Sequence, residues 1–183
     1  MKLQSERLTL REITIDDIPW IHQLNSIPEV DRYNTLGLPK SITDTENIIL
    51  PIIEDQKKDP RPRYVWLIQD AQQDCIGLTG MVMGKPNYAS AEIWYKIIPS
   101  YWNNGFATEF VGCLLSFTFN HLKLHRLIAG CATQNLASIC VLEKNGFRKE
   151  SHHRKILPIR GEWVDNYEYA ILEEDYFKRT IND

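Results

Sequence analysis

A glycine between a strand-like run and a helix-like run is the feature that most constrains this chain. The strand-like run covers 91–98 and the helix-like run covers 108–121. The junction between them reads Tyr101-Trp102-Asn103-Asn104-Gly105-Phe106-Ala107-Thr108-Glu109. Glycine lets the backbone turn sharply, and the first amides of the following helix have no partner within that helix. These amides and the helix dipole predict either a site for an anion such as phosphate, or a plain turn that needs only glycine's freedom.

The composition indicates a globular chain long enough to form one substantial core. Of its 183 residues, 43% are hydrophobic and 25% are charged, and we expect a single domain over residues 1–183. The 21 basic and 24 acidic residues give a net charge of −3. This balance argues against a nucleic-acid partner and is compatible with an amine substrate.

The distribution of apolar residues and cysteines favours a cytoplasmic protein. No apolar run approaches the roughly 20 residues that cross a bilayer, so we expect no membrane partner. Residues 1–7 lack the apolar core of a signal peptide. The four cysteines form no CxxC motif and no evident disulfide pattern.

The periodicity of the sequence predicts an α+β fold with the order β-α-α-β-β-β-α-β-α-β-β around one mixed sheet. The predicted strands cover 7–13, 64–69, 75–83, 91–98, 126–131, 148–156 and 164–172. We expect a long loop over 25–40, and Pro51 should kink or divide the second helix. Arg160-Gly161 should form the turn of the last hairpin.

A second motif follows 26 residues after the glycine-containing junction. It reads Asn135-x-Ala137-Ser138-x-x-Val141-Leu142-Glu143-Lys144-x-Gly146-Phe147. A third, Gly161-x-Trp163-x-Asp165-x-x-x-Tyr169, lies in the last hairpin. With these three motifs in order, nearly the whole chain resembles the GNAT superfamily of acyl-CoA-dependent N-acetyltransferases. More narrowly it is similar to the RimJ/RimL-type branch, which acetylates protein N-termini or small amines.

The resemblance implies a mixed, mostly antiparallel sheet whose fourth and fifth strands splay apart, with helices on its faces. The pantetheine arm of acetyl-CoA would lie in the gap and pair with backbone groups at Ile97, as an added strand does. The diphosphate would rest on the amides of Asn103, Asn104, Gly105, Phe106, Ala107 and Thr108. In that context the junction is a diphosphate loop rather than a plain turn.

Two positions depart from the family's pattern. Trp102 stands where a Gln or Arg often helps to hold the diphosphate, although tryptophan is common there in the RimJ/RimL branch. Leu142 stands where many members carry the Tyr that protonates the departing thiolate, so Ser138 is the remaining candidate. Ser138 and Asn135 are expected to contact the CoA arm, or they only organise the start of their helix.

Acetyl transfer to an amine also needs a base near the splayed strands. Glu92 is our candidate because it begins the fourth strand, where the branch often places an acid; the alternative is an exposed strand residue. No metal site is expected, because His121 and His125 flank a helix-to-strand transition and the adjacent His152 and His153 point to opposite faces.

We therefore expect an acetyl-CoA-dependent N-acetyltransferase whose acceptor is a primary amine, either a protein N-terminus or a small molecule. Direct attack in a ternary complex is expected, since no activated cysteine with a base is visible. A peptide acceptor would need an open groove, and a small amine a closed pocket with acids such as Glu29, Asp31 or Glu92. The alternative is a non-catalytic acyl-CoA sensor. Branch members often dimerise, so a homodimer is an option.

Overall fold

The computed structural model describes residues 1–182 and contains one eight-stranded sheet, in the order β1-β2-β3-β4-β5-β6-β8-β7. All neighbouring strands are antiparallel except β5 and β6. The strands are β1 (Lys2–Gln4), β2 (Thr9–Glu12), β3 (Arg63–Gln69), β4 (Cys75–Met83), β5 (Ser90–Ile97), β6 (Arg126–Ala132), β7 (Arg148–Ile159) and β8 (Glu162–Leu172). This is the mixed, mostly antiparallel α+β fold that the sequence predicts.

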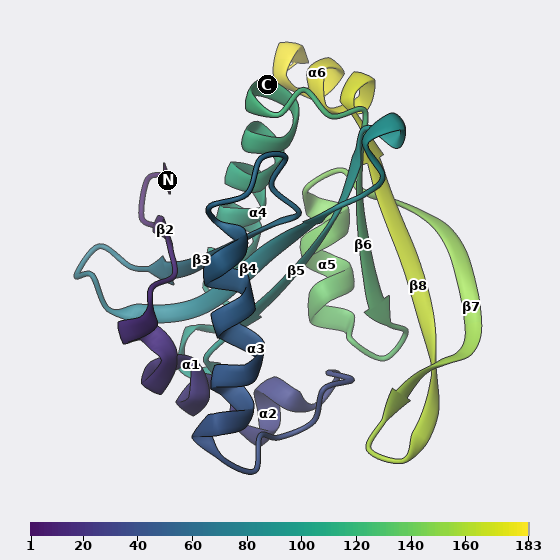
Figure 1. The fold of residues 1–183 in the computed structure, drawn as a ribbon. Helices are drawn as coiled ribbons and strands as arrows, with labels where there is room; N and C mark the ends of the chain where they lie inside the picture. The colour runs from purple at the N-terminus through teal and green to yellow at the C-terminus, as the bar shows by residue number, and fades with distance from the viewer. Residues whose placement is uncertain (183) are drawn as a thin grey trace.

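Helices cover both faces of the sheet (Figure 1). One face carries α1 and α3, and the other carries α4 and α5. The helices are α1 (Ile18–Asn25), α2 (Pro28–Asp31), α3 (Ile42–Asp55), α4 (Phe106–Ser116), α5 (Leu136–Lys144) and α6 (Glu173–Asn182), and a π-helical turn, η4 (Phe117–His121), continues α4. None of these helices is long and apolar enough to cross a membrane.

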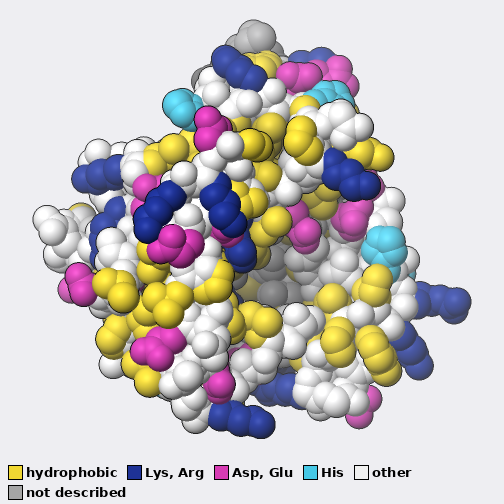
Figure 2. All heavy atoms as spheres, viewed as in Figure 1, with side chains coloured by type: hydrophobic (Ala, Val, Ile, Leu, Met, Phe, Trp, Pro, Cys, Tyr) yellow, Lys and Arg dark blue, Asp and Glu magenta, His cyan; other side chains and the backbone are white. Residues whose placement is uncertain are grey.

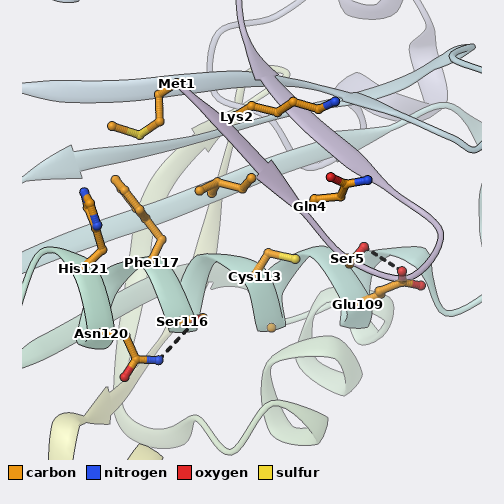
Figure 3. Close-up of a pocket in the computed structure, with 12 residues that line it drawn as sticks. Met1, Lys2, Gln4, Ser5, Glu109, Cys113, Ser116, Phe117, Asn120 and His121 are labelled. Carbon is orange, nitrogen blue, oxygen red and sulfur yellow. Dashed lines mark hydrogen bonds between the residues drawn. The ribbon is translucent and has the colours of Figure 1, made fainter.

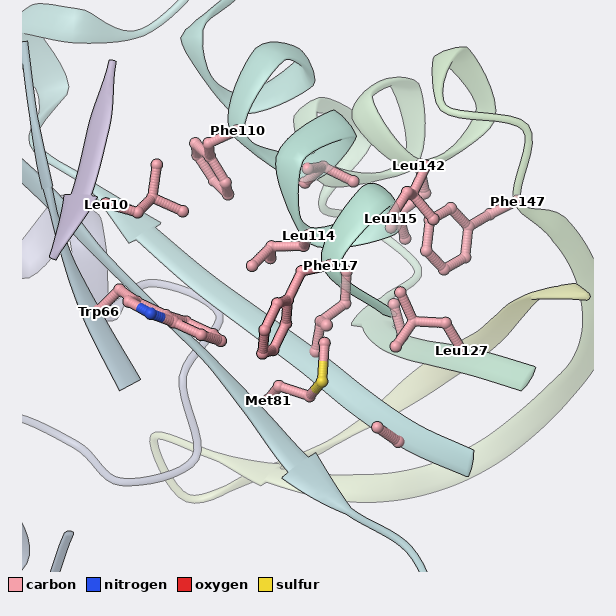
Figure 4. Close-up of a cluster of buried hydrophobic side chains, with 14 of the residues drawn as sticks. Leu10, Trp66, Met81, Phe110, Leu114, Leu115, Phe117, Leu127, Leu142 and Phe147 are labelled. Atoms are coloured by element: carbon pink, nitrogen blue, oxygen red, sulfur yellow. The ribbon is translucent and has the colours of Figure 1, made fainter. Parts of the chain in front are cut away.

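The larger core lies between the sheet and α4. Phe110 and Leu114 of α4 and Phe117 of η4 pack against Trp66 of β3 and Met81 of β4 (Figure 4). The smaller core, under α1 and α3, takes the opposite set of strand residues, including Val65 and Leu67 of β3. Because side chains alternate along a strand, β3 is buried on both faces.

The pairing of β5 with β6 ends soon after it begins. The two parallel strands are in register only over Ser90–Glu92 and Arg126–Ile128, and then they diverge. These are the predicted fourth and fifth strands, which become β5 and β6 because the sequence did not indicate β1. The expected splay is therefore confirmed.

Four local features differ from the predicted elements. β1, which is only three residues long, and α6, which follows β8, are both absent from the predicted elements. The expected loop over 25–40 contains the short helix α2. Pro51 does not divide α3, which continues to Asp55 with that proline inside it. The final turn is as predicted: Arg160 and Gly161 have φ of 50° and 83° between β7 and β8.

Candidate active site

The unpaired half of β5 turns backbone groups toward the gap. The Ile98 N–H donates to the Ile76 carbonyl of β4 at 2.9 Å. Along a strand, the backbone N–H and C=O groups of successive residues point alternately to the two neighbouring strands. Since Ile98 bonds β4, the odd-numbered residues Ile93, Tyr95 and Ile97 direct their N–H and C=O groups to the side of β6. Since pairing with β6 stops at residue 92, this stretch forms a strand edge inside the sheet.

The loop at the end of β5 leads into α4 through left-handed backbone. Asn103 has φ of 60° and Gly105 has φ of 78°, and Gly105 is the N-cap of α4. The first helical hydrogen bond runs from the Glu109 N–H to the Gly105 carbonyl at 3.0 Å. The amides of Phe106, Ala107 and Thr108 precede that bond, so they have no acceptor within the helix, which is the arrangement that suits an anion.

Contacts from outside hold this loop. Arg7 donates from Nε to Glu109 at 2.7 Å and from Nη1 to the Asn104 carbonyl at 3.3 Å. Its guanidinium lies 4.4 Å above the centre of the Phe106 ring. Ser5 donates to the same Glu109 carboxylate at 2.7 Å. Sequence reasoning missed this cluster, whose members lie about one hundred residues apart.

Trp102 also takes part, although it brings no charge. Its indole N–H donates to the Ile97 carbonyl at 2.8 Å, which ties the start of the loop to the end of β5. The Asn104 side chain donates back to the Trp102 carbonyl at 2.9 Å. Trp102 therefore replaces the side-chain charge of the family's loop with a fixed loop geometry.

At the start of α5, Asn135 and Ser138 lie on the face of the sheet that carries α4 and α5. The Asn135 side chain accepts from the Ser138 N–H at 3.2 Å and caps the helix. The Ser138 hydroxyl lies 2.8 Å from the Tyr95 hydroxyl of β5. Ser138 thus ties the start of α5 to the unpaired half of β5. Leu142, at the position of the family's Tyr, is fully buried in the core.

Glu92 lies on the opposite face of the sheet. A Cβ atom added to Gly130 of β6 would be 3.7 Å from the Glu92 carboxylate and 3.4 Å from the Asn166 amide of β8. The missing side chain at Gly130 therefore leaves space between these polar groups. The Glu92 side chain is exposed to solvent at the edge of this space, and its partial desolvation, followed by the charge of Glu168, raises its pKa above the ordinary value.

The two predicted catalytic residues thus border the gap from opposite faces. Ala91, Ile93 and Ile97 belong to the core under α4, so the alternate residues of β5, including Glu92, face α1 and α3. In Figure 2 this face is hollowed where β5 and β6 diverge in Figure 1, and acidic side chains lie along the rim of the hollow.

Three segments beside the hollow are linked by side-chain contacts. Arg160, in the turn between β7 and β8, donates to the Pro28 carbonyl of α2 at 2.8 Å and lies 3.8 Å from the Asp31 carboxylate. The Tyr33 hydroxyl donates to the Gln134 carbonyl at 3.1 Å. The loop after α1, the hairpin and the β6–α5 connection therefore meet one another.

Asp31 and Lys96 are charged side chains on the α1 and α3 side of the sheet, and each has a different partner. Asp31 is almost fully buried, whereas Glu29 is exposed. Lys96, on the same face of β5 as Glu92, donates to Asn25 at 2.7 Å. Burial lowers the pKa of Lys96 to about 8, against the opposing effect of the Asp31 charge.

The histidines and cysteines form no reactive pair at the gap. His152 bonds Asp165 at 2.6 Å and His153 bonds Ser151 at 2.7 Å, and the two rings lie on opposite faces as predicted. Burial raises the pKa of the Cys131 thiol to about 11. Within residues 1–182, no group of three or more His, Cys, Asp or Glu side chains is arranged to hold a metal ion.

A separate groove of about 780 Å³ runs between β1 and α4. Cys113, Phe117 and His121 rise from the helix toward β1 (Figure 3). Neither Glu92 nor Ser138 lines it. The groove is thus distinct from the gap between β5 and β6.

Known proteins resemble this chain in sequence and in fold. The sequence model of the acetyltransferase (GNAT) domain matches residues 7–148. The uncharacterized N-acetyltransferase YnaD of Bacillus subtilis is 31% identical over 181 residues, which covers 96% of this chain and 99% of YnaD. A spermidine N(1)-acetyltransferase of Vibrio cholerae is 28% identical over 176 residues, covering 96% and 99% of the two chains.

A solved structure agrees with these sequence matches. The spermidine N-acetyltransferase from Vibrio cholerae in complex with CoA and spermine superimposes with a TM-score of 0.85 at 26% identity, covering 94% of this chain and 99% of the other. The family model spans more than half of the chain, and the curated relatives match it almost end to end. This chain therefore belongs to the GNAT family and is an acetyl-CoA-dependent N-acetyltransferase.

Proposed function

We propose that this enzyme transfers the acetyl group of acetyl-CoA directly to a small-molecule primary amine. The observation that carries the proposal is the gap between β5 and β6, with Glu92 on one face and Ser138 on the other. The hollow on the side of α1 and α3 (Figure 2) lets the amine approach Glu92 from that face, while the thioester is held within the gap. The high pKa of Cys131 argues against a covalent cysteine intermediate.

The residues around the gap fit acetyl-CoA, which supplies the activated acetyl group. The edge of β5 offers the amide and carbonyl of Tyr95 and the amide of Ile97 to the pantetheine arm, while the Ile97 carbonyl accepts from Trp102. The free amides of Phe106, Ala107 and Thr108 suit the diphosphate, with Asn103, Asn104 and Gly105 shaping the loop. Asn135 contributes by capping the helix that carries Ser138.

Glu92 is the proposed general base. A base acts in its ionised form, and a carboxylate whose pKa is raised toward neutrality accepts a proton from an amine more readily. Partial desolvation and the charge of Glu168 both raise the pKa of Glu92. On the other face, Ser138 is the proposed hydrogen-bond donor to the leaving sulfur.

The proposed acceptor is a small amine rather than a protein N-terminus. The contacts of Arg160 with α2 and of Tyr33 with Gln134 link the segments beside the hollow, where a peptide would have to continue. Glu92 and Glu168 would attract a cationic amine. The names of the Vibrio cholerae relatives make spermidine and spermine the first acceptors to test.

We also place the chain in the RimJ/RimL-type branch of the family. The Asn-x-x-Ser motif at Asn135 and Ser138, with Trp102 in the loop before α4, supports this placement. We further propose that residues 1–183 form a single domain and that the chain assembles as a homodimer.

The test is amine-dependent release of the CoA thiol across spermidine, spermine, shorter diamines and N-terminal peptides. Glu92→Gln should abolish most of the turnover at neutral pH while retaining acetyl-CoA binding. Glu54→Gln is the matched control, because Glu54 is an exposed carboxylate on α3 that pairs with Lys57. Release with peptides but not with small amines would reject the proposed acceptor. Tight acetyl-CoA binding without release for any acceptor would favour a sensor.

A further inference from the structure

The Tyr95 phenol is the closest polar neighbour of the Ser138 hydroxyl. Tyr95 lies in the unpaired half of β5, and its ring packs edge-on against Phe110 of α4 at 5.4 Å. Its hydroxyl lies 2.8 Å from the Ser138 hydroxyl and 3.5 Å from the Ser138 carbonyl. The shorter distance identifies the hydroxyl as the main partner.

Two hydroxyls bonded to each other have one O–H left over. If Tyr95 donates to Ser138, the Ser138 proton can point elsewhere; if Ser138 donates, the phenol proton remains. The Ser138 backbone N–H is already held by Asn135, so the start of α5 fixes where the pair lies. The Tyr95 and Ser138 side chains both lie on the face of the sheet that carries α4 and α5, beside the point where β5 and β6 diverge.

We infer that Tyr95 is a positioning residue for acetyl transfer, holding the Ser138 hydroxyl so that one O–H of the pair donates to the leaving sulfur. The inference rests on the proposed function and deepens it. In this chain the phenol comes from β5. In many relatives, by contrast, a tyrosine at the helix position of Leu142 would supply it. Leu142 is buried and apolar, so it leaves that role to another residue.

The pair would act by hydrogen bonding without giving up its proton. The acceptor nitrogen bonds the acetyl carbon, the carbon–sulfur bond breaks, and its electron pair stays on sulfur. A thiol ionises near a pKa of about 8.5, whereas burial raises the pKa of Tyr95 above its ordinary value of 10.0. Complete proton transfer from the phenol to sulfur is therefore unfavourable. Glu92 takes the proton that nitrogen loses, and solvent protonates the released thiolate.

Kinetics and ligand binding test this inference together. Tyr95→Phe and Ser138→Ala should each lower kcat roughly 10- to 100-fold, as expected for losing a hydrogen bond to a charged atom. Acetyl-CoA affinity should stay within about twofold. Because the two hydroxyls act as one unit, the double variant should be no slower than the slower single variant.

Binding of CoA and desulfo-CoA supplies a measurement independent of turnover. The wild type should prefer CoA over desulfo-CoA increasingly as the pH rises through the thiol pKa, because the pair stabilises the thiolate. Tyr95→Phe should lose that pH-dependent preference. A purely structural role would weaken both ligands equally at every pH, and that result would overturn the inference.

Tyr169→Phe is the matched control. Tyr169 is buried, whereas Tyr95 is half-buried, and it also bonds α5, since its hydroxyl donates to Glu143 at 3.0 Å; it comes from β8, and its partner is Glu143 rather than Ser138. This variant should keep the wild-type kcat and the wild-type CoA preference. Unchanged kcat in Tyr95→Phe would refute the inference while leaving the transferase intact. If the wild type releases no thiol with any amine, the proposed function fails, and the CoA preference still reports on Tyr95.

Discussion

Replacing Arg7 by alanine tests whether the loop before α4, our proposed diphosphate site, is held in shape from the N-terminal segment. The side chain is about half exposed, so its ion pair with Glu109 is worth about 0.5 kcal/mol after screening. The cation–π contact with Phe106 adds about 0.5 kcal/mol at such a site. The bond to the Asn104 carbonyl adds about 0.5 kcal/mol. Together these give about 1.5 kcal/mol.

If all of this energy stabilises the binding conformation of the loop, Arg7→Ala should weaken acetyl-CoA binding about tenfold. Titration calorimetry measures the Kd, and kcat at saturating acetyl-CoA should be unchanged. Arg148→Ala is the control, since Arg148 forms an exposed ion pair with Asp175 far from the loop. A Kd within twofold of wild type, with the same loss of unfolding free energy as the control, would refute the reasoning.

Three further outcomes follow from the geometry. Gly105→Ala places a Cβ on a residue with φ of 78°, and a non-glycine residue in this left-handed state costs about 1–2 kcal/mol of free energy. The variant should therefore weaken acetyl-CoA binding in the same calorimetric assay. Glu168→Gln removes a charge that raises the pKa of Glu92; since the base works only when ionised, the acid limb of the kcat/KM–pH profile should move to lower pH. Gly80→Ala puts a Cβ 2.6 Å from the Trp94 ring and should lower the unfolding free energy by about 1–3 kcal/mol in urea.

Local rules predicted the parts of the site that are contiguous in sequence. Strand alternation placed His152 and His153 on opposite faces, and the glycine junction located the turn into α4. The family resemblance supplied the splay, which periodicity alone does not contain. Gly105 was informative because few other residues adopt its left-handed backbone.

The remaining features depend on tertiary contacts. Tyr95 looks like an ordinary strand aromatic until the fold brings α5 against it, 43 residues later in sequence. The pairing of Arg7 with Glu109 spans 102 residues, and neither residue lies in a charge pattern that would suggest it. Asn135 could be either a cap or a ligand from its spacing, and only the coordinates show the cap.

Under the proposed function, the contact between Arg160 and α2 makes the length of the last hairpin a limit on the size of the acceptor. Each strand residue spans about 3.3 Å, so removing two residues from each of β7 and β8 would withdraw the turn by about 7 Å. Because side chains repeat every two residues, His153 and Glu168 would keep their faces while Arg160 lost its hold on Pro28. Hairpin length alone, with no change to Glu92 or Ser138, would then decide whether the hollow admits a compact amine or the end of a longer chain.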